Sequence, residues 1–472
     1  MRKSRANLPD WSGMIPLLQG EGSRASALYA AMRGLVESGQ LQPGAKLPPS
    51  RQLATQLSIS RGAVVAAFDQ LVAEGFAEAM VGSGTFVAPA VPRPSGQPRK
   101  PTFEPDLLPF RPGRMGSAMM DAAAFATLRR LIAKDLRQPA LRGLHYSDPR
   151  GSEELREEIA SYLRSARGVR LHADQVMITS GSQQALDFVL RALLAPGDAV
   201  WMEDPGYPAV VALMRGNGLK ISPVPVDAEG LAVTIGRTLA PRAKAVYVTP
   251  SHQYPLGVTM TMPRRLSLLD WARSSSAWII EDDYDSEFRY AGPPLTSLQG
   301  MDGADRVIYL GTFSKALFPG LRVGYVVLPT AIMEHVIALR ERTDRYPQTL
   351  AEGALAAFLR DGHFASHLRR ARKRARKSRD ALVSGLSEGP IKANSPAQGL
   401  HLVAQVPRRL SEGRAVQLAA EAGLNARPLS GMYLAAKPEP GLLIGFSAFS
   451  PDDFYRVSRA FSRLAAREQG RR

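Results

Sequence analysis

The chain lacks cysteine, is poor in histidine and contains no long apolar run. Its 472 residues include no cysteine, which excludes disulfides, thiolate metal sites and cysteine nucleophiles. The 7 histidines show no pairing at metal-ligand spacing, so we expect no metal site. No apolar stretch approaches the ~20 residues of a membrane span. The basic N-terminal residues precede no apolar signal segment. We therefore expect a cytoplasmic protein.

Positive charge is what the chain has in excess. The formal net charge is +17, which favours a polyanionic partner. The first 90 residues are only mildly basic, whereas residues 369–379 (RRARKRARKSR) hold eight basic residues in eleven. On a helix these side chains would point all round the axis. This segment is therefore either a solvated helix or a second nucleic-acid surface.

Composition divides the chain into three parts. A chain of this length is expected to form two or three domains. Residues 15–88 show short helical patterns, and residues 89–112 are rich in proline, which predicts an extended linker. Residues 113–472 alternate helical patterns with short β-branched runs, which predicts an α/β domain with a mainly parallel sheet.

The N-terminal part has the pattern of a DNA reader. One helix is predicted over residues 26–37, a second begins with Ser50 as its N-cap, and Ser60 caps a third. Two short helices with a tight turn predict a helix-turn-helix whose third helix enters the major groove. Residues 76–80 and 84–87 flank Gly82, which permits a hairpin turn. Together these elements predict a winged helix.

Residues 41–87 (LQPGAKLPPSRQLATQLSISRGAVVAAFDQLVAEGF…GSGTFV) resemble the GntR-type winged helix over its whole length. This chain carries Gly62, Ala63 and Ala66 where that family commonly has polar, threonine and basic residues, so the operator preference is expected to differ. The resemblance implies DNA contacts at the starts of the second and third helices and in the wing: Arg51, Ser60, Arg61, Ser83, Gly84 and Thr85.

A lysine follows one of five apolar runs that each end in polar residues. The runs cover residues 176–179, 199–202, 245–248, 278–280 and 307–310. In open α/β sheets, ligands gather at the carboxyl ends of the strands. Lys315 follows the fifth run, and a lysine in that position suits a Schiff base to an aldehyde cofactor. Thr312, Ser314 and Arg322 are suitable donors for a phosphate.

Pyridoxal 5′-phosphate gives every polar strand end a role. Asp282 would pair with the ring nitrogen and keep it protonated. Tyr284 would donate to the ring oxygen, and Tyr207 would stack on the ring face. The phosphate would be held by residues at the start of one helix and around the lysine: Ser182, Gln183, Thr312, Ser314 and Arg322.

Residues ~113–465 resemble a fold-type I aminotransferase, and the whole chain resembles the MocR/GabR subfamily of bacterial regulators. The strings that carry the resemblance are TSGSQQAL, EDPGYP, TPSHQYPLG, IIEDDYDSEF and GTFSKALFPGLRVGY. The resemblance implies pyridoxal 5′-phosphate, a small C-terminal α+β subdomain and a head-to-tail homodimer with swapped domains. It also implies transcriptional control by an amine, an amino acid or the cofactor itself. Tyr146 matches a tyrosine that reaches the phosphate from the partner subunit.

Two departures separate the chain from working aminotransferases. Their usual Asn-Pro-Thr-Gly is replaced by residues 254–257 (YPLG), so His252 or Gln253 would have to supply the missing hydrogen bond. Their carboxylate-binding arginine precedes a strand motif that resembles residues 442–447 (LLIGFS), and this stretch begins with leucine and isoleucine and holds no arginine. Arg427 either substitutes for it or belongs to a buried structural pair, unless the effector has no α-carboxylate.

These departures favour a regulator over an enzyme. The leading hypothesis is a pyridoxal-phosphate-dependent transcriptional regulator in which a ligand at Lys315 changes DNA binding. The second is an active aminotransferase with an accessory DNA-binding head. The third is a DNA-binding protein whose large domain has lost its cofactor.

Overall fold

The computed structural model divides the chain into two compact units, residues 1–107 and 108–472. It describes residues 23–89, 111–114, 116, 120–137, 146–292, 295–303 and 305–470. The start of the expected DNA-binding part, residues 15–22, and almost all of the expected linker lie outside these ranges. No helix within them is both long and apolar enough to cross a membrane.

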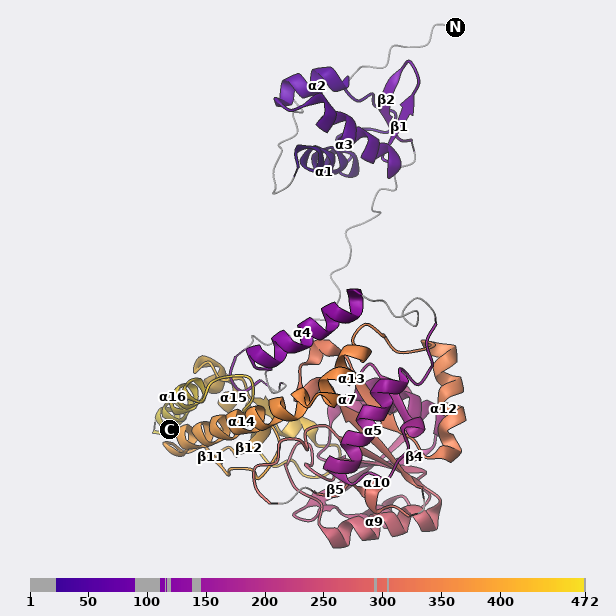
Figure 1. The fold of residues 1–472 in the computed structure, drawn as a ribbon. Coiled ribbons are helices and arrows are strands. Elements are labelled where there is room, and N and C mark those ends of the chain that lie inside the picture. Colours follow the sequence, from indigo (N-terminus) through magenta and orange to yellow (C-terminus); the bar gives the residue numbers. More distant parts are fainter. Residues whose placement is uncertain are drawn as a thin grey trace. The chain divides into compact units, whose positions relative to one another are not determined.

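The N-terminal unit is a winged helix (Figure 1). The third helix lies against the first two through a small apolar core that includes Leu28, Met32, Val64 and Leu71. The two strands form an antiparallel hairpin in which Met80 pairs with Gly84. Its elements are α1 (Arg24–Glu37), α2 (Ser50–Leu57), α3 (Arg61–Ala73), β1 (Ala77–Met80) and β2 (Gly84–Val87).

One of the two predicted helix caps is confirmed. The Ser60 side chain accepts a hydrogen bond from the backbone N–H of Ala63 at 3.2 Å, as an N-cap serine does. Ser50 is not a cap, because Pro49 occupies the N-cap position and Ser50 is the first helical residue. The Ser50 hydroxyl instead accepts a hydrogen bond from Arg61 at 3.4 Å.

The larger unit is built around an eight-stranded sheet with the order β3-β10-β9-β8-β7-β4-β5-β6. Strands β9, β8, β7, β4 and β5 are mutually parallel, whereas β10 runs antiparallel to β3 and β9. The strands are β3 (Val176–Thr179), β4 (Ala199–Asp204), β5 (Lys220–Asp227), β6 (Gly230–Leu231), β7 (Ala245–Val248), β8 (Trp278–Asp283), β9 (Val307–Thr312) and β10 (Gly324–Val327). The mainly parallel sheet predicted from the alternating pattern is confirmed.

Helices cover both faces of this sheet, because its strands are apolar on both sides. Ile308 of β9 packs in one apolar cluster with α6, α7 and α12, and its neighbour Tyr309 packs in another with α4, α5, α13 and α14 (His363–Ser387). A third cluster holds α8, α9 and α10. The helices of this unit up to α13 are α4 (Ala122–Arg137), α5 (Glu153–Arg167), α6 (Ser182–Leu193), α7 (Pro208–Gly216), α8 (Val233–Leu239), α9 (Met262–Ser275), α10 (Leu298–Met301), α11 (Phe313–Ala316), α12 (Thr330–Thr343) and α13 (Glu352–Arg360).

The C-terminal part forms the expected small α+β subdomain. Its four-stranded antiparallel sheet has the order β11-β12-β14-β13, and a separate apolar cluster joins the sheet to three helices. The elements are α14 (His363–Ser387), β11 (Lys392–Ala393), β12 (His401–Gln405), α15 (Glu412–Glu421), β13 (Arg427–Pro428), β14 (Gly441–Gly445) and α16 (Pro451–Gly470).

Strand direction in the large sheet places the polar strand ends at one edge. The carboxyl ends of β4, β7, β8 and β9 lie together because these strands are parallel. Gly324, the first residue of β10, pairs with Thr312 on one side and Thr179 on the other. The end of β3 and the start of α6 therefore lie at the same edge.

Candidate functional site

Lys315 lies in the short helix α11, directly after β9. Thr312 caps this helix by accepting a hydrogen bond from the Ser314 backbone N–H at 3.1 Å. Burial lowers the pKa of Lys315, and the carboxylates of Asp285 and Asp282 oppose this shift. A lowered pKa makes the neutral amine more available, and that form attacks an aldehyde.

Asp282 offers one unpaired carboxylate oxygen inside the site. Its Oδ2 accepts a hydrogen bond from the Tyr247 hydroxyl at 2.6 Å, but Oδ1 is buried without a hydrogen-bond partner among the described residues. Burial raises the pKa of Asp282 to about 6, while the Tyr247 hydrogen bond lowers it. An unpaired buried acceptor of this kind fits a protonated ring nitrogen. Tyr247 is a partner that was not predicted from the sequence.

The neighbouring carboxylate Asp283 serves the scaffold instead. Its Oδ2 is paired with the Arg167 guanidinium at 2.7 Å and also accepts a hydrogen bond from the Tyr309 hydroxyl. Successive strand residues point to opposite faces of a sheet, so only one of the two adjacent carboxylates points toward the candidate site beside Lys315. Asp282 and Asp283 therefore carry different roles.

A basic side chain lies against the turn that opens α6. Gly181, the N-cap of α6, has a φ of 110°, and a Cβ built on it would lie 3.6 Å from Nη1 of Arg322. Arg322 itself has a φ of 53°, a conformation that non-glycine residues rarely adopt and that the surrounding structure must enforce. The first turn of a helix leaves backbone N–H groups unpaired, so a guanidinium beside it makes an anion site.

Ser182 and Gln183 lie in that first helical turn. The Gln183 side chain is directed away from the turn, since its Nε2 donates to the carbonyl oxygen of Ala209 at 3.2 Å. Its backbone N–H, in the first helical turn, is the donor best placed for a phosphate.

Aromatic rings gather over the same edge. Tyr207 is 38% exposed and packs edge-on against Tyr254, with ring centroids 5.1 Å apart. The Tyr284 hydroxyl donates to the His252 carbonyl oxygen at 3.0 Å and lies 3.2 Å from His252 Nδ1. These rings can cover and orient a planar ligand.

His252 and Gln253, the two alternatives for the missing asparagine, are both engaged elsewhere. Gln253 Nε2 donates to the carbonyl oxygens of Tyr254 at 2.7 Å and Pro205 at 2.9 Å. His252 Nδ1 lies 3.0 and 3.1 Å from the two carboxylate oxygens of Asp285. The loop itself uses both hydrogens of the Gln253 amide, so in this structure Gln253 does not offer the hydrogen bond that the asparagine would supply.

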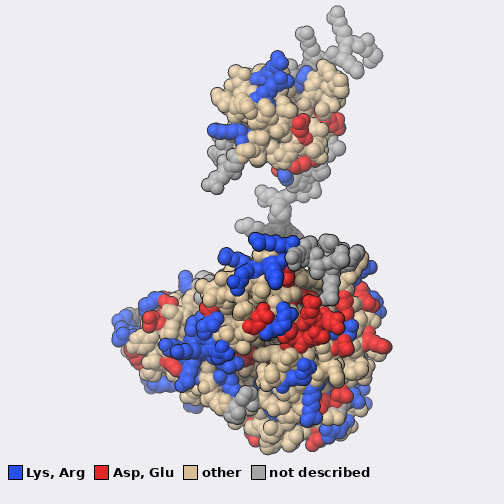
Figure 2. Space-filling view, viewed as in Figure 1, with Lys and Arg blue, Asp and Glu red and all other residues tan. Residues whose placement is uncertain are grey.

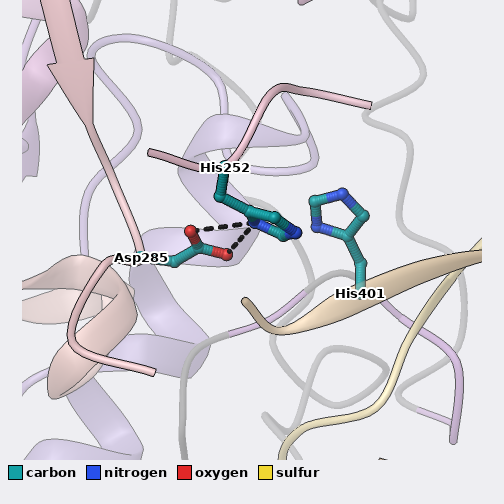
Figure 3. Close-up of side chains that lie close together, drawn as sticks. All are labelled: His252, Asp285 and His401. Atoms are coloured by element: carbon teal, nitrogen blue, oxygen red, sulfur yellow. Dashed lines mark hydrogen bonds and ion pairs between the residues drawn. The ribbon is translucent and has the colours of Figure 1, made fainter. Parts of the chain in front are cut away.

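His252 and Asp285 form a buried cluster with His401 (Figure 3). One side-chain nitrogen or oxygen from each residue lies within 4.8 Å of the others. His401 comes from β12, far along the chain from His252, so the sequence shows no pairing of the two histidines. Spacing along the sequence does not detect a pairing that the fold makes.

Arg427 and Tyr146 are both exposed. Arg427 lies on β13 and pairs with Leu443 of β14, and its charge lowers the pKa of Lys315 and of Tyr254. The alternative that it forms a buried structural pair is wrong, because its side chain reaches the surface. Tyr146 is 78% exposed, with the Arg345 guanidinium 5.1 Å from its ring centre.

The N-terminal unit exposes basic side chains at the starts of two helices. Arg51 and Arg61 are both exposed, and the hydrogen bond from Arg61 to Ser50 brings the two helix starts together. In the wing, Ser83 and Gly84 are exposed and Thr85 is half-buried. A Cβ on Gly84 would lie 3.0 Å from Cε of Lys46. Lys46 is therefore a further basic side chain beside the wing, and it was not predicted from the sequence.

The basic segment 369–379 lies within α14, and its charges are partly engaged. Arg370 pairs with Asp121 at 2.7 Å, and Arg379 is buried and pairs with Asp380 at 2.6 Å. Other basic residues of the segment, such as Lys373 and Arg376, are exposed. Figure 2 shows Lys and Arg side chains over both α14 and α4. Arg379 turns inward whereas Lys373 and Arg376 face solvent, so the basic side chains point to different sides of the helix.

Comparison with known proteins assigns both units. The model of bacterial regulatory proteins of the gntR family matches residues 24–87, and the model of aminotransferase class I and II matches residues 121–451. The chain is 36% identical over 452 residues to the probable rhizopine catabolism regulatory protein MocR of Rhizobium meliloti, covering 90% of each chain. It is 35% identical over 434 residues to the pyridoxine biosynthesis transcriptional regulator PdxR of Corynebacterium glutamicum, covering 90% of this chain and 92% of that one.

A solved structure supports the fold and the cofactor. The kynurenine aminotransferase of Pyrococcus horikoshii, crystallised with PMP, matches with a TM-score of 0.68 and 28% identity over 75% of this chain and 90% of its own. The unpaired oxygen of Asp282 and the anion site beside Arg322 fit pyridoxal 5′-phosphate, which is the cofactor indicated for this domain. With its GntR-type winged helix and its aminotransferase-like domain, the chain belongs to the MocR subfamily of GntR-type transcriptional regulators.

Proposed function

We propose that this regulator senses a small amine, an amino acid or pyridoxal 5′-phosphate itself at Lys315, and that occupancy of the site changes DNA binding. The observation that carries the proposal is that a half-buried lysine of lowered pKa lies near Asp282, one carboxylate oxygen of which has no hydrogen-bond partner among the described residues. A buried unsatisfied acceptor costs stability, and so does removing the charged form of an amine from water. Both are explained by a bound cofactor.

Each residue at the strand ends has a distinct task in this proposal. When bound, pyridoxal 5′-phosphate supplies a reactive aldehyde and an electron-accepting ring. Lys315 provides the amine that holds the aldehyde, and Asp282 keeps the ring nitrogen protonated. Tyr284 orients the ring oxygen, and Tyr207 covers one ring face. The phosphate is held by the start of α6 and by hydroxyl and guanidinium groups: Ser182, Gln183, Thr312, Ser314 and Arg322.

Arg427 is the proposed contact for an effector carboxylate. The strand next to it, β14, offers only apolar residues where aminotransferases carry their arginine, and Arg427 pairs with Leu443 of that strand. Its charge is near enough to lower the pKa of Lys315. A guanidinium at this place would orient an amino acid with its amine toward Lys315.

DNA binding would use the exposed starts of α2 and α3 together with the wing. The proposed contacts are Arg51, Ser60, Arg61, Ser83, Gly84 and Thr85. We further propose a head-to-tail homodimer in which Tyr146 of one subunit reaches the phosphate of the other. A dimer would also present two winged helices, which suits a two-part operator.

Cofactor loading tests the site directly. Purified protein incubated with pyridoxal 5′-phosphate should gain an absorption band of the lysine-bound cofactor, and Lys315→Ala should abolish it. The variant Lys134→Ala, at an exposed lysine of α4, serves as the matched control and should load normally. No band in the wild type would show that the large domain has lost its cofactor, and an equal band in Lys315→Ala would show that another amine holds it.

The second candidate, an active aminotransferase, is favoured by the intact lysine and Asp282. Incubation with amino donors and 2-oxoacids distinguishes it, because an enzyme sustains many turnovers whereas a sensor converts its bound cofactor at most once. Sustained turnover would refute a purely regulatory role.

A further inference from the structure

Three buried side chains next to the cofactor site have an unusual hydrogen-bonding pattern. His252 follows β7, Asp285 follows β8 and His401 begins β12. Their exposed fractions are 2%, 1% and 1%. Water therefore does not reach these groups freely, and each polar atom needs a partner within the protein.

In each imidazole the nitrogen that faces away from the other ring, Nδ1 of His252 and Nε2 of His401, must carry a hydrogen. His252 Nδ1 faces the Asp285 carboxylate at 3.0 and 3.1 Å, and an ionised carboxylate only accepts hydrogen bonds. His401 Nε2 lies 3.1 Å from the carbonyl oxygen of Pro255, which also only accepts. If both rings were neutral, the single N–H hydrogen of each ring would be used in its contact with Asp285 or Pro255.

The two nitrogens on the sides where the rings face each other would then carry a lone pair and no hydrogen. His252 Nε2 and His401 Nδ1 are buried without a hydrogen-bond partner among the described residues. The ring centroids are 4.6 Å apart, and Figure 3 shows one nitrogen of each ring directed toward the other ring. Two buried acceptors that face each other are unsatisfied and repel, which is costly.

Tight packing limits what else could satisfy these nitrogens. A Cβ on Gly399 would lie 1.8 Å from Cε1 of His252, and one on Gly257 would lie 3.2 Å from His252 Nε2. Zinc takes three or four protein ligands. Here Asp285 and His252 Nδ1 bond each other, which leaves only two nitrogens for an ion. One additional proton satisfies both nitrogens with no added atom.

We propose that His252 and His401 share one proton between Nε2 of His252 and Nδ1 of His401, so that His252 is a cation paired with Asp285, and that this unit positions Tyr284. The two imidazoles together hold one positive charge. Burial and the neighbouring His252 lower the pKa of His401 to about 3, so His401 remains the neutral acceptor. The Tyr284 oxygen lies 3.2 Å from His252 Nδ1, which places a charged donor beside the hydroxyl that faces the cofactor.

Other titratable groups around the pair are few. Tyr284 and Asp285 face it from the loop after β8, and Tyr254 packs against His401 from the loop after β7, with centroids 5.5 Å apart. Lys315 of α11 acts from further away by lowering the pKa of His401. The effect on Tyr284 rests on the proposed cofactor site, whereas the shared proton does not.

Imidazole nitrogen NMR of the full-length protein tests the shared proton. With [15N]histidine there are 7 imidazoles, observed first without cofactor. At pH 8, about 1.5 units above the ordinary histidine pKa of about 6.5, we expect one ring to keep both nitrogens protonated. His401→Asn should remove this cationic signal, because an asparagine amide can donate to His252 Nε2 without an extra proton. His335→Asn, at an exposed histidine of α12, should leave it intact.

Several outcomes would overturn the shared proton. One is that all rings are neutral at pH 8, as a bridging water would give. Another is a cationic signal that persists in His401→Asn. The third is stoichiometric uptake of added Zn²⁺ with loss of the cationic signal.

The pH dependence of stability gives an independent readout. Because only the folded pair holds the extra proton, the stabilisation that the proton gives is complete below pH ~6.5 and is lost once the pH is high enough for the pair to release it. The Tm of the wild type should therefore fall toward that of His401→Asn between pH 6.5 and 9, whereas His335→Asn should follow the wild type. Parallel wild-type and His401→Asn curves would contradict the proposal.

The role toward Tyr284 is tested on the protein loaded with pyridoxal 5′-phosphate. His401→Asn should shift the cofactor absorption band in the same direction as Tyr284→Phe. An unshifted band would refute the positioning role and leave the shared proton standing. Failure of the wild type to load cofactor would refute the proposed function without affecting the histidine pair.

Discussion

Replacing Tyr247 by phenylalanine should move the pH dependence of cofactor binding upward. The Tyr247 hydroxyl donates to Asp282 at 2.6 Å, and both side chains are buried. This hydrogen bond lowers the pKa of Asp282, which burial has raised to about 6. Only the ionised carboxylate can pair with a protonated ring nitrogen. Binding should therefore weaken as the pH falls through the pKa of Asp282.

The size of the shift follows from the hydrogen bond. A hydrogen bond to a charged group contributes about 1.5–3 kcal/mol, and one pKa unit corresponds to about 1.4 kcal/mol. Loss of the Tyr247 hydroxyl should then raise the pKa of Asp282 by about one to two units. At pH 7 this protonates about half to nine-tenths of the carboxyl groups, so cofactor affinity should fall about two- to tenfold.

Cofactor titrations from pH 5 to 9, followed by absorbance, measure this shift. Tyr309→Phe is the matched control, because it removes the same hydroxyl from Asp283 on the same strand. Asp283 pairs with Arg167 rather than pointing toward the candidate site beside Lys315, so this control should keep the wild-type midpoint. Equal midpoints in all three proteins would refute the role assigned to Asp282.

Three further predictions concern DNA and the effector. Arg51→Ala and Arg61→Ala should each weaken operator binding about 5- to 100-fold, as loss of a base or phosphate contact does, while the cofactor band stays unchanged; full operator affinity would contradict this. Reversing exposed charges of α14 with Arg369→Glu and Lys373→Glu should leave the salt dependence of DNA binding unaltered, whereas a DNA surface would lose about 0.9 in slope per phosphate contact. Arg427→Ala should weaken the response to carboxylate effectors about tenfold or more but spare simple amines, and an equal loss for both would exclude a carboxylate contact.

The sequence predicted the strand ends because the signals there are local. A run of apolar residues followed by a polar or small residue identifies a buried strand and its carboxyl end, as at β8 and β9. Asp282 and Lys315 lie directly after or within such runs. Knowing that the strands are parallel is then enough to bring these residues to one edge.

Partners that come from distant segments could not be predicted in this way. Tyr247 reads as one more apolar strand residue, and only the pairing of β7 with β8 brings its hydroxyl to Asp282. His401 lies in the C-terminal subdomain, so no local pattern connects it to His252. Gln253 has a suitable side chain for the cofactor, but the direction of that side chain depends on the whole loop.

Cap positions show a similar limit at short range. Ser60 and Ser50 both precede helical patterns, yet only Ser60 caps its helix. Pro49 takes the cap position before Ser50, because its fixed φ suits the extended backbone required there. The resulting freedom of the Ser50 hydroxyl allows its contact with Arg61.

The central claim is that ligand binding at Lys315 controls DNA binding. The most direct measurement titrates candidate amines, amino acids and free pyridoxal 5′-phosphate while following both the cofactor absorbance and operator affinity in the same samples. At least one ligand should change both signals over the same concentration range, and Lys315→Ala should abolish the coupling while retaining basal operator binding. An operator affinity that stays constant while the absorbance changes, or that responds equally in Lys315→Ala, would contradict the account.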